Sequence, residues 1–205
     1  MRPELPSIVA ILRGVTPDRV VDIAQILLAE DIRAIEVPLN SPDPFQSIAR
    51  LAKAIGQDCL CGAGTVLSID EVDRVADAGG RLIVSPNTDP AVIEKTRAKD
   101  LLALPGFATA SEAFAAMRAG AEHLKLFPAA TYGPDHLRAL RAVLPSRVSV
   151  FAVGGVTADN VAPWSAAGVA GFGFGSELFK PGYSDGEIQT RARRLHRAVH
   201  DAMKM

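Results

Sequence analysis

The chain has 205 residues, 48% of them hydrophobic and 22% charged, which is enough apolar material for the core of one domain or a small pair. A formal net charge of −1 and an aromatic content of 5% argue against a nucleic-acid surface, which needs basic patches and stacking rings. We therefore expect small molecules, or further copies of the chain, as partners.

The cysteines and the N-terminus bear on the compartment. Cys59 and Cys61 are separated by one residue in a predicted strand, where geometry disfavours a disulfide between them, so a cytoplasmic location fits best. Residues 1–7 hold two prolines and no long apolar stretch. We expect neither a signal peptide nor a membrane span.

Apolar runs alternate with amphipathic stretches from the start of the chain. In the first half, strands are expected at residues 8–12, 34–37, 59–63 and 81–84. Helices are expected at residues 16–30 and 44–55, after Ser68, and from about residue 89. Ser68 and Glu71 have the spacing of a capping box, in which both side chains satisfy free backbone N–H groups at the start of a helix.

The alternation continues to the C-terminus. Further strands are expected at residues 101–104, around Lys125, and at 148–153 and 168–175. A helix is expected after the capping sequence of residues 109–112, and others at 134–143, 157–167 and 185–203.

Eight strand and helix pairs with short connections predict parallel strands covered by helices. Eight is the number that closes a (β/α)₈ barrel, or TIM barrel, so we expect a single α/β barrel domain over residues 1–205. An open, doubly wound sheet is the alternative, because 205 residues is near the short end for a barrel. It would need an edge, and no strand has a polar, edge-like pattern.

Lys125 lies in an apolar strand, Leu124-Lys125-Leu126-Phe127-Pro128. Burial lowers the pKa of a lysine and leaves a share of neutral amine, which can attack a carbonyl and form a Schiff base. The alternative is a packed stem whose amine reaches water. Alternation turns both Lys125 and Glu36 toward the barrel interior. They form a candidate nucleophile and acid/base pair, or else a buried ion pair.

Other polar and small residues close neighbouring strands. Arg13 and Thr65 indicate a pocket for a carboxylate. Gly154-Gly155 and Gly175-Ser176 follow the last two strands, where barrels commonly bind phosphate with backbone N–H groups. These glycines could instead serve only tight turns. We favour a phosphorylated substrate because of their position.

The sequence indicates neither a metal nor a cofactor. Of the four histidines, His123, His136, His196 and His200, only the last two have helical spacing, and they lack the intervening glutamate of a zinc protease. The glycines at 171, 173 and 175 do not have the spacing of a dinucleotide fingerprint.

Six ordered motifs between about residues 8 and 182 resemble the 2-keto-3-deoxy-6-phosphosugar acid aldolases. They are Ile11-Leu12-Arg13-Gly14, Ile35-Glu36-Val37-Pro38-Leu39-Asn40-Ser41, Gly62-Ala63-Gly64-Thr65-Val66-Leu67, Ser85-Pro86-Asn87, Leu124-Lys125-Leu126-Phe127-Pro128 and Phe151-Ala152-Val153-Gly154-Gly155-Val156. The resemblance implies reversible cleavage of a phosphorylated keto acid into pyruvate and glyceraldehyde 3-phosphate without a metal, by a homotrimer.

The resemblance also implies a role for each site residue. Lys125 would form the Schiff base and Glu36 would donate and accept protons. Arg13 and Thr65 would hold the keto acid end of the substrate. The phosphate end would lie on Gly155, Gly175 and Ser176.

Two branches of that family differ in the stereochemistry of the substrate. The phosphogluconate branch usually has a threonine before the paired glycines, whereas this chain has Val153, so it resembles the phosphogalactonate branch. A methyl group in place of a hydroxyl removes a partner for the C4 hydroxyl, which distinguishes the two sugars. The alternatives are the phosphogluconate epimer or broad specificity, a non-catalytic binder of phosphorylated ligands, and a sugar phosphate isomerase or epimerase.

Overall fold

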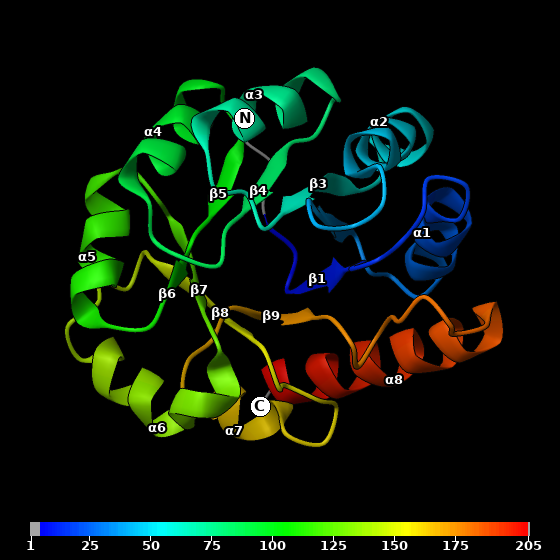
Figure 1. Cartoon of the computed structure of the whole chain (residues 1–205). Helices are drawn as coiled ribbons and strands as arrows, with labels where there is room; N and C mark the ends of the chain where they lie inside the picture. Colours follow the sequence, from blue (N-terminus) through cyan, green and yellow to red (C-terminus); the bar gives the residue numbers. More distant parts are fainter. Residues whose placement is uncertain (1–4, 205) are drawn as a thin grey trace.

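The computed structural model describes residues 5–204, and these residues form a parallel barrel with helices around it (Figure 1). The expectation for the N-terminal segment falls mainly on residues 1–4, which lie outside this range. The strands are β1 (Ile8–Ile11), β2 (Ala34–Pro38), β3 (Leu60–Gly64), β4 (Leu82–Val84), β5 (Leu102–Leu104), β6 (Gly106–Phe107), β7 (His123–Leu126), β8 (Ser149–Val153) and β9 (Gly171–Phe174).

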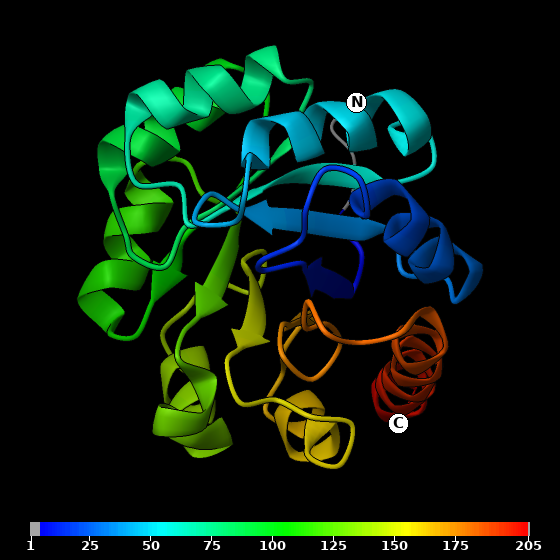
Figure 2. The ribbon, with the colours of Figure 1, turned by 45° about the vertical axis from the view of Figure 1, so that its right-hand side comes forward.

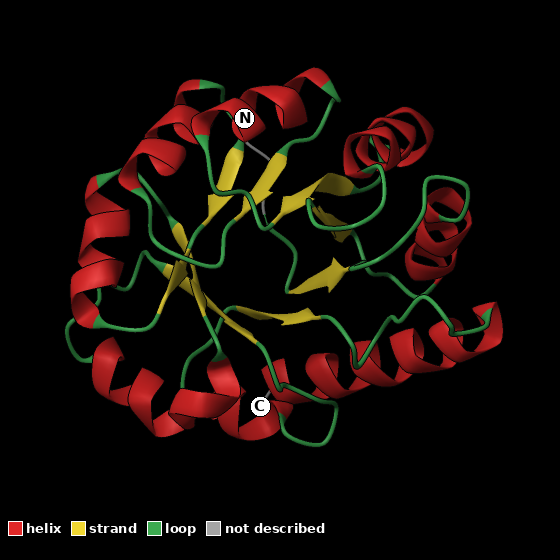
Figure 3. Ribbon diagram, viewed as in Figure 1, coloured by secondary structure: helices red, strands yellow, loops and turns green. Residues whose placement is uncertain are grey.

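Helices follow the strands and cover the outside of the barrel (Figure 3). They are α1 (Val20–Ala29), α2 (Pro44–Ile55), α3 (Ile69–Asp77), α4 (Pro90–Ala98), α5 (Ala110–Arg118), α6 (Ala129–Arg141), α7 (Val161–Ala166) and α8 (Asp185–Met203). The long helix α8 packs against α1 and α7, so the last helix of the chain lies beside the first helix (Figure 2).

The sheet has the order β5-β4-β3-β2-β1-β9-β8-β7-β6, and every pair in it is parallel. Its two outer members, β5 and β6, are consecutive in the chain and are separated only by Pro105. Proline has no N–H group for the ladder, which explains the interruption. The Pro105 carbonyl still accepts a hydrogen bond of 2.8 Å from Lys125 N–H. The predicted fifth strand therefore extends to Phe107 and closes the barrel, which confirms the predicted (β/α)₈ fold.

Strand alternation divides the core into two layers. The outer layer, between strands and helices, contains Ile35 and Val37 from β2 and Leu124 and Leu126 from β7. The inner layer fills the barrel and contains neighbouring inward residues such as Ala34 and Phe151. Because side chains alternate along a strand, Glu36 and Lys125 face the interior, as predicted.

Local signals predicted some helix boundaries and missed others. The capping boxes at Ser68 and Thr109 are both present. The helix predicted at 134–143 instead begins at Ala129 and is kinked at Gly133, whose φ of 77° is not helical. Its first turn is attached to the residue after β8 by a hydrogen bond of 2.9 Å from Ala130 N–H to the Gly154 carbonyl, a contact between distant segments that the local pattern does not reveal.

Candidate active site

Glu36 lies at the middle of β2 and is only 2% exposed. Its neighbours in the sheet are Ile11 on β1 and Gly62 on β3. The space for its carboxyl group exists because Gly64, two residues further along β3, has no side chain: a Cβ there would lie 2.0 Å from Glu36 Oε2. Among the described residues, Oε2 has no hydrogen-bond partner. The carboxyl group is therefore available to another molecule.

Lys125 lies on β7 and is 6% exposed. It pairs with Gly106 on one side and Phe151 on the other. Its Nζ atom lies 4.7 Å from the centre of the Phe127 ring, which faces the cavity described below. In the order of the sheet, β2 and β7 are on opposite sides of the barrel, so Glu36 and Lys125 project inward from opposing walls.

Burial shifts the pKa values of Glu36 and Lys125 toward pH 7 from opposite directions. Desolvation raises the pKa of the Glu36 carboxyl to about 7, although the charges of Lys125 and Arg13 oppose this effect. Desolvation lowers the pKa of the Lys125 amine to about 8, opposed by Glu36 and assisted by Arg13. Near pH 7 a share of the amine is therefore neutral and nucleophilic, and Glu36 can both take up and release a proton.

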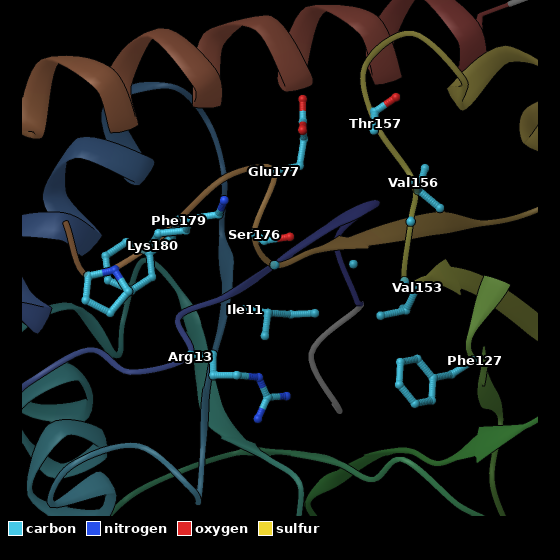
Figure 4. A pocket seen from close by; sticks show the side chains of 15 residues that line it. Ile11, Arg13, Phe127, Val153, Val156, Thr157, Ser176, Glu177, Phe179 and Lys180 are labelled. Carbon is cyan, nitrogen blue, oxygen red and sulfur yellow. The ribbon is translucent and has the colours of Figure 1, made fainter. Parts of the chain in front are cut away.

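A cavity of about 540 Å³ opens at the carboxyl ends of β1, β8 and β9 (Figure 4). Among the residues proposed from sequence, its lining includes Arg13, Val153, Gly154, Gly155, Gly175 and Ser176. Lys125, Glu36 and Thr65 are not part of this lining. The Lys125 amine instead contacts the ring of Phe127, which is part of the lining.

The glycines between β8 and α7 have conformations that other residues rarely adopt. The φ angles of Gly154 and Gly155 are 94° and 76°. A Cβ at Gly155 would also lie 2.4 Å from the Cβ of Ala130 on α6. The Asn160 side chain closes the turn, because it accepts a hydrogen bond from Thr157 N–H and donates one to the Gly155 carbonyl. This rigid turn presents backbone atoms to the cavity.

Thr65 directly follows β3 and is half-buried. Its φ angle is 57°, in the left-handed region, which is unusual for a β-branched residue. Thr65 directly follows Gly64, the residue whose missing side chain leaves room for the Glu36 carboxyl, and it is not part of the cavity lining.

Sequence reasoning missed Lys180, which lines the cavity. In Figure 4, Lys180 lies on the side of Ser176 and Glu177, whereas the Arg13 guanidinium lies on the side of Ile11 and Phe127. The Glu177 carboxylate is 3.9 Å from Arg194 on α8, which also forms an ion pair of 2.7 Å with Asp159. A lone lysine in a loop has no periodic pattern, and only its place four residues after Ser176 hinted at a role.

Residues 5–204 contain neither a cluster of metal ligands nor a membrane-spanning helix. No group of three or more His, Cys, Asp or Glu side chains in this range is arranged to hold a metal ion. No helix within it is long and apolar enough to cross a membrane.

The chain is similar to known proteins along most of its length. A family model described as KDPG and KHG aldolase matches residues 3–190. The chain is 44% identical over 197 residues to 2-dehydro-3-deoxy-6-phosphogalactonate aldolase of Escherichia coli (strain K12), with 96% of each chain covered. It is 49% identical over 185 residues to a probable 2-dehydro-3-deoxy-6-phosphogalactonate aldolase of Rhizobium meliloti (strain 1021), covering 90% of this chain and 87% of the relative.

A solved structure described as native KDPGal has a TM-score of 0.96 and 43% identity, with 100% of this chain and 99% of that chain covered. The barrel and these relatives define the class of protein: an aldolase, which is a carbon–carbon lyase. Within that class, the chain belongs to the KDPG and KHG aldolase family.

Proposed function

We propose that this chain is a class I aldolase that reversibly cleaves 2-dehydro-3-deoxy-6-phosphogalactonate into pyruvate and glyceraldehyde 3-phosphate. The observation that carries the proposal is the pair of inward groups, Lys125 and Glu36, on opposing walls of the barrel mouth. A pure binding protein has no need for a buried amine near a buried carboxyl. An isomerase or epimerase would use an acid/base residue but no Schiff base.

In the proposed reaction, the neutral Lys125 amine attacks the C2 carbonyl of the substrate to form a carbinolamine. The protonated Glu36 carboxyl gives its proton to the carbinolamine hydroxyl, which leaves as water, and the protonated imine forms. Glu36 then takes the proton of the C4 hydroxyl. The C3–C4 bond breaks, its electron pair passes into the imine to form an enamine, and glyceraldehyde 3-phosphate leaves. Glu36 returns the proton to C3. Hydrolysis of the new protonated imine releases pyruvate and the neutral amine, and the proton that it sets free returns to the Glu36 carboxylate.

The two ends of the cavity fit a substrate with an anionic group at each end. Arg13, on the side of the cavity where Phe127 contacts Lys125, would bind the carboxylate, together with Thr65. Backbone N–H groups of Gly155 and Gly175 and the Ser176 hydroxyl would bind the phosphate. We add Lys180 to this set, because it brings a positive charge to the same end.

Val153 supports the galactonate epimer as the preferred substrate. Its side chain is 5% exposed and lines the cavity directly before Gly154 and Gly155. A valine offers no hydrogen bond to a C4 hydroxyl that points toward it. The relatives with the highest identities quoted above carry the galactonate name as well.

We also propose a cytoplasmic homotrimer. Buried Cys59 and Cys61 are unbridged, which supports a reducing compartment. The trimer rests on family membership alone, and the mass of the particle in solution tests it.

The test of the proposed function is chemical trapping. Incubation with pyruvate and borohydride should inactivate the protein and add one reduced pyruvyl group to Lys125, which peptide mass spectrometry locates. The Lys125→Arg variant should show no adduct, because a guanidinium stays protonated and cannot form the imine. An adduct on an exposed lysine such as Lys99 with Lys125 unmodified, or turnover by Lys125→Arg, would refute the mechanism.

A further inference from the structure

Two loops at the barrel mouth are joined by a pair of hydrogen bonds. Arg13 Nη1 donates to Asn40 Oδ1, and Gly14 N–H donates to Ser41 Oγ over 2.9 Å. Consecutive residues after β1 are thus held by consecutive residues after β2, the strand that carries Glu36. The loop after β2 therefore controls both the backbone and the side chain of this segment.

The backbone of the Arg13–Gly14 segment is also held from the opposite side. Gly14 has a φ of 82°, and a Cβ on it would lie 2.9 Å from Pro181 Cγ. Ser41 is buried, so its bond to Gly14 is sheltered from water. The Arg13 side chain, by contrast, is exposed and has many rotamers. Among the described residues, the hydrogen bond to Asn40 is the one that holds the Arg13 side chain in a single rotamer.

The chemical nature of the partner matters. The amide oxygen of Asn40 accepts a hydrogen bond but carries no net charge, so it orients the guanidinium and leaves its positive charge uncompensated. An aspartate of nearly the same shape would form an ion pair and compete with an anionic substrate for Arg13. The uncompensated charge also reaches the buried pair, since Arg13 lowers the pKa values of Lys125 and Glu36.

We propose that Asn40 is a positioning residue, which holds the Arg13 guanidinium in place for the carboxylate of the keto acid without neutralising it. This inference rests on the proposed function, because that function assigns the carboxylate to Arg13. It adds a requirement for a neutral acceptor at position 40.

The test compares Asn40→Ala and Asn40→Asp with Gln46→Ala, an exposed residue on α2, as the matched control. The rate of borohydride trapping is measured against pyruvate concentration and against methyl pyruvate, which lacks the carboxylate. For both Asn40 variants we expect the half-saturating pyruvate concentration to rise about tenfold, the effect of losing one charge-assisted hydrogen bond between Arg13 and the pyruvate carboxylate. The maximal trapping rate and the methyl pyruvate reaction should stay within about twofold of the control.

The pH profile separates positioning from a general structural defect. The Asn40→Asp carboxylate would offset the charge of Arg13, so the pH at which trapping is half-maximal should rise in this variant. Asn40→Ala leaves that charge in place and should shift this pH less. A merely structural role for Asn40 predicts equal changes for pyruvate and methyl pyruvate, and that result would overturn the inference.

The Arg13→Ala variant distinguishes a failure of the proposed function from a failure of the inference about Asn40. If Arg13→Ala binds pyruvate as the unmodified protein does, the assignment of the carboxylate in the proposed function is wrong. If Arg13→Ala weakens pyruvate binding but Asn40→Asp behaves like Gln46→Ala, the proposed function stands and the inference about Asn40 is refuted.

Discussion

The carboxyl group of Glu36 occupies the volume that a side chain at Gly64 would need. A Cβ at Gly64 would lie 2.0 Å from Oε2 and 2.4 Å from Oε1. The two residues belong to adjacent strands, and the pairing of Pro38 with Gly64 sets their relative height. A glycine on β3 thus determines where the carboxyl group of β2 can lie.

Gly64→Ala should therefore impair catalysis more than stability. The methyl group meets the far end of a flexible side chain, which can move, so the free energy of unfolding should fall by only about 1 kcal/mol. A displaced Glu36 should lower turnover on the order of 10²- to 10⁴-fold, as loss of a general acid/base does.

Trapping of pyruvate on Lys125 should persist in Gly64→Ala, whereas exchange of pyruvate methyl protons in deuterated water should slow. Gly186→Ala is the control, since nothing lies within 4 Å of that position. Unchanged proton exchange in Gly64→Ala would contradict the assignment of Glu36.

Stability should depend on pH through Glu36. Its pKa of about 7 in the folded state exceeds the ordinary value of 4.5, so the folded protein holds a proton that the unfolded chain has already released. This contribution is fully present below about pH 4.5 and is lost as pH rises through about 7.

We expect the free energy of unfolding, relative to Glu36→Gln, to decrease by about 1 to 3 kcal/mol from about pH 5 to pH 8. Loss of the Glu36 charge also lowers the pKa of Lys125 in the variant, which adds to the difference in the same direction. Urea titrations at several pH values measure it. A difference that is constant with pH would show that the carboxyl is ionised throughout.

Lys180→Met should weaken binding of phosphorylated substrates. Lys180 is exposed, so solvent screens its charge and we expect a three- to tenfold rise in KM, about 1 kcal/mol, that diminishes at high salt. Pyruvate methyl exchange, which needs no phosphate, should be unaffected, and Lys180→Arg should retain most of the affinity. Lys53→Met, which removes an exposed lysine on α2, is the control. Equal loss with glyceraldehyde and with glyceraldehyde 3-phosphate would exclude a role for Lys180 at the phosphate.

Val153→Thr should reduce the preference for the galactonate epimer. A buried C4 hydroxyl without a partner costs about 1 to 3 kcal/mol, which corresponds to roughly tenfold to a hundredfold in kcat/KM. Valine and threonine have nearly the same shape, so the variant should keep the fold, although the added hydroxyl lowers the free energy of unfolding by about 1 to 3 kcal/mol where it finds no partner. The ratio of kcat/KM for the two epimers is the measurement. If the unmodified protein prefers the gluconate, or if the ratio is unchanged in the variant, the stereochemical choice is made elsewhere in the cavity.

Several features could be predicted because they depend on neighbours in the chain. The period-2 pattern around Glu36 and Lys125 placed both side chains inside the barrel, since alternation is a property of any strand. Helix α2 was predicted with its observed bounds, Pro44–Ile55, and the capping boxes at Ser68 and Thr109 were predicted from a spacing of three residues. Repetition of such local units was enough to predict the barrel.

Other features depend on contacts between segments that are distant in the chain. The first turn of α6 is hydrogen-bonded to Gly154, and the Arg13 side chain is hydrogen-bonded to Asn40. The Glu36 carboxyl fits only because Gly64 has no side chain. These contacts do not recur at a fixed spacing in the sequence, so no local pattern predicts them.

The sequence by itself determined the number and order of the elements and which residues face the interior, because hydrophobic periodicity follows from the geometry of helices and strands. Tertiary structure alone decided that the predicted fifth strand continues past Pro105 to close the barrel, that Lys180 joins the cavity and that Thr65 stays outside its lining. It also decided the pKa values of Lys125 and Glu36, because these depend on how much water the assembled barrel removes around each charge.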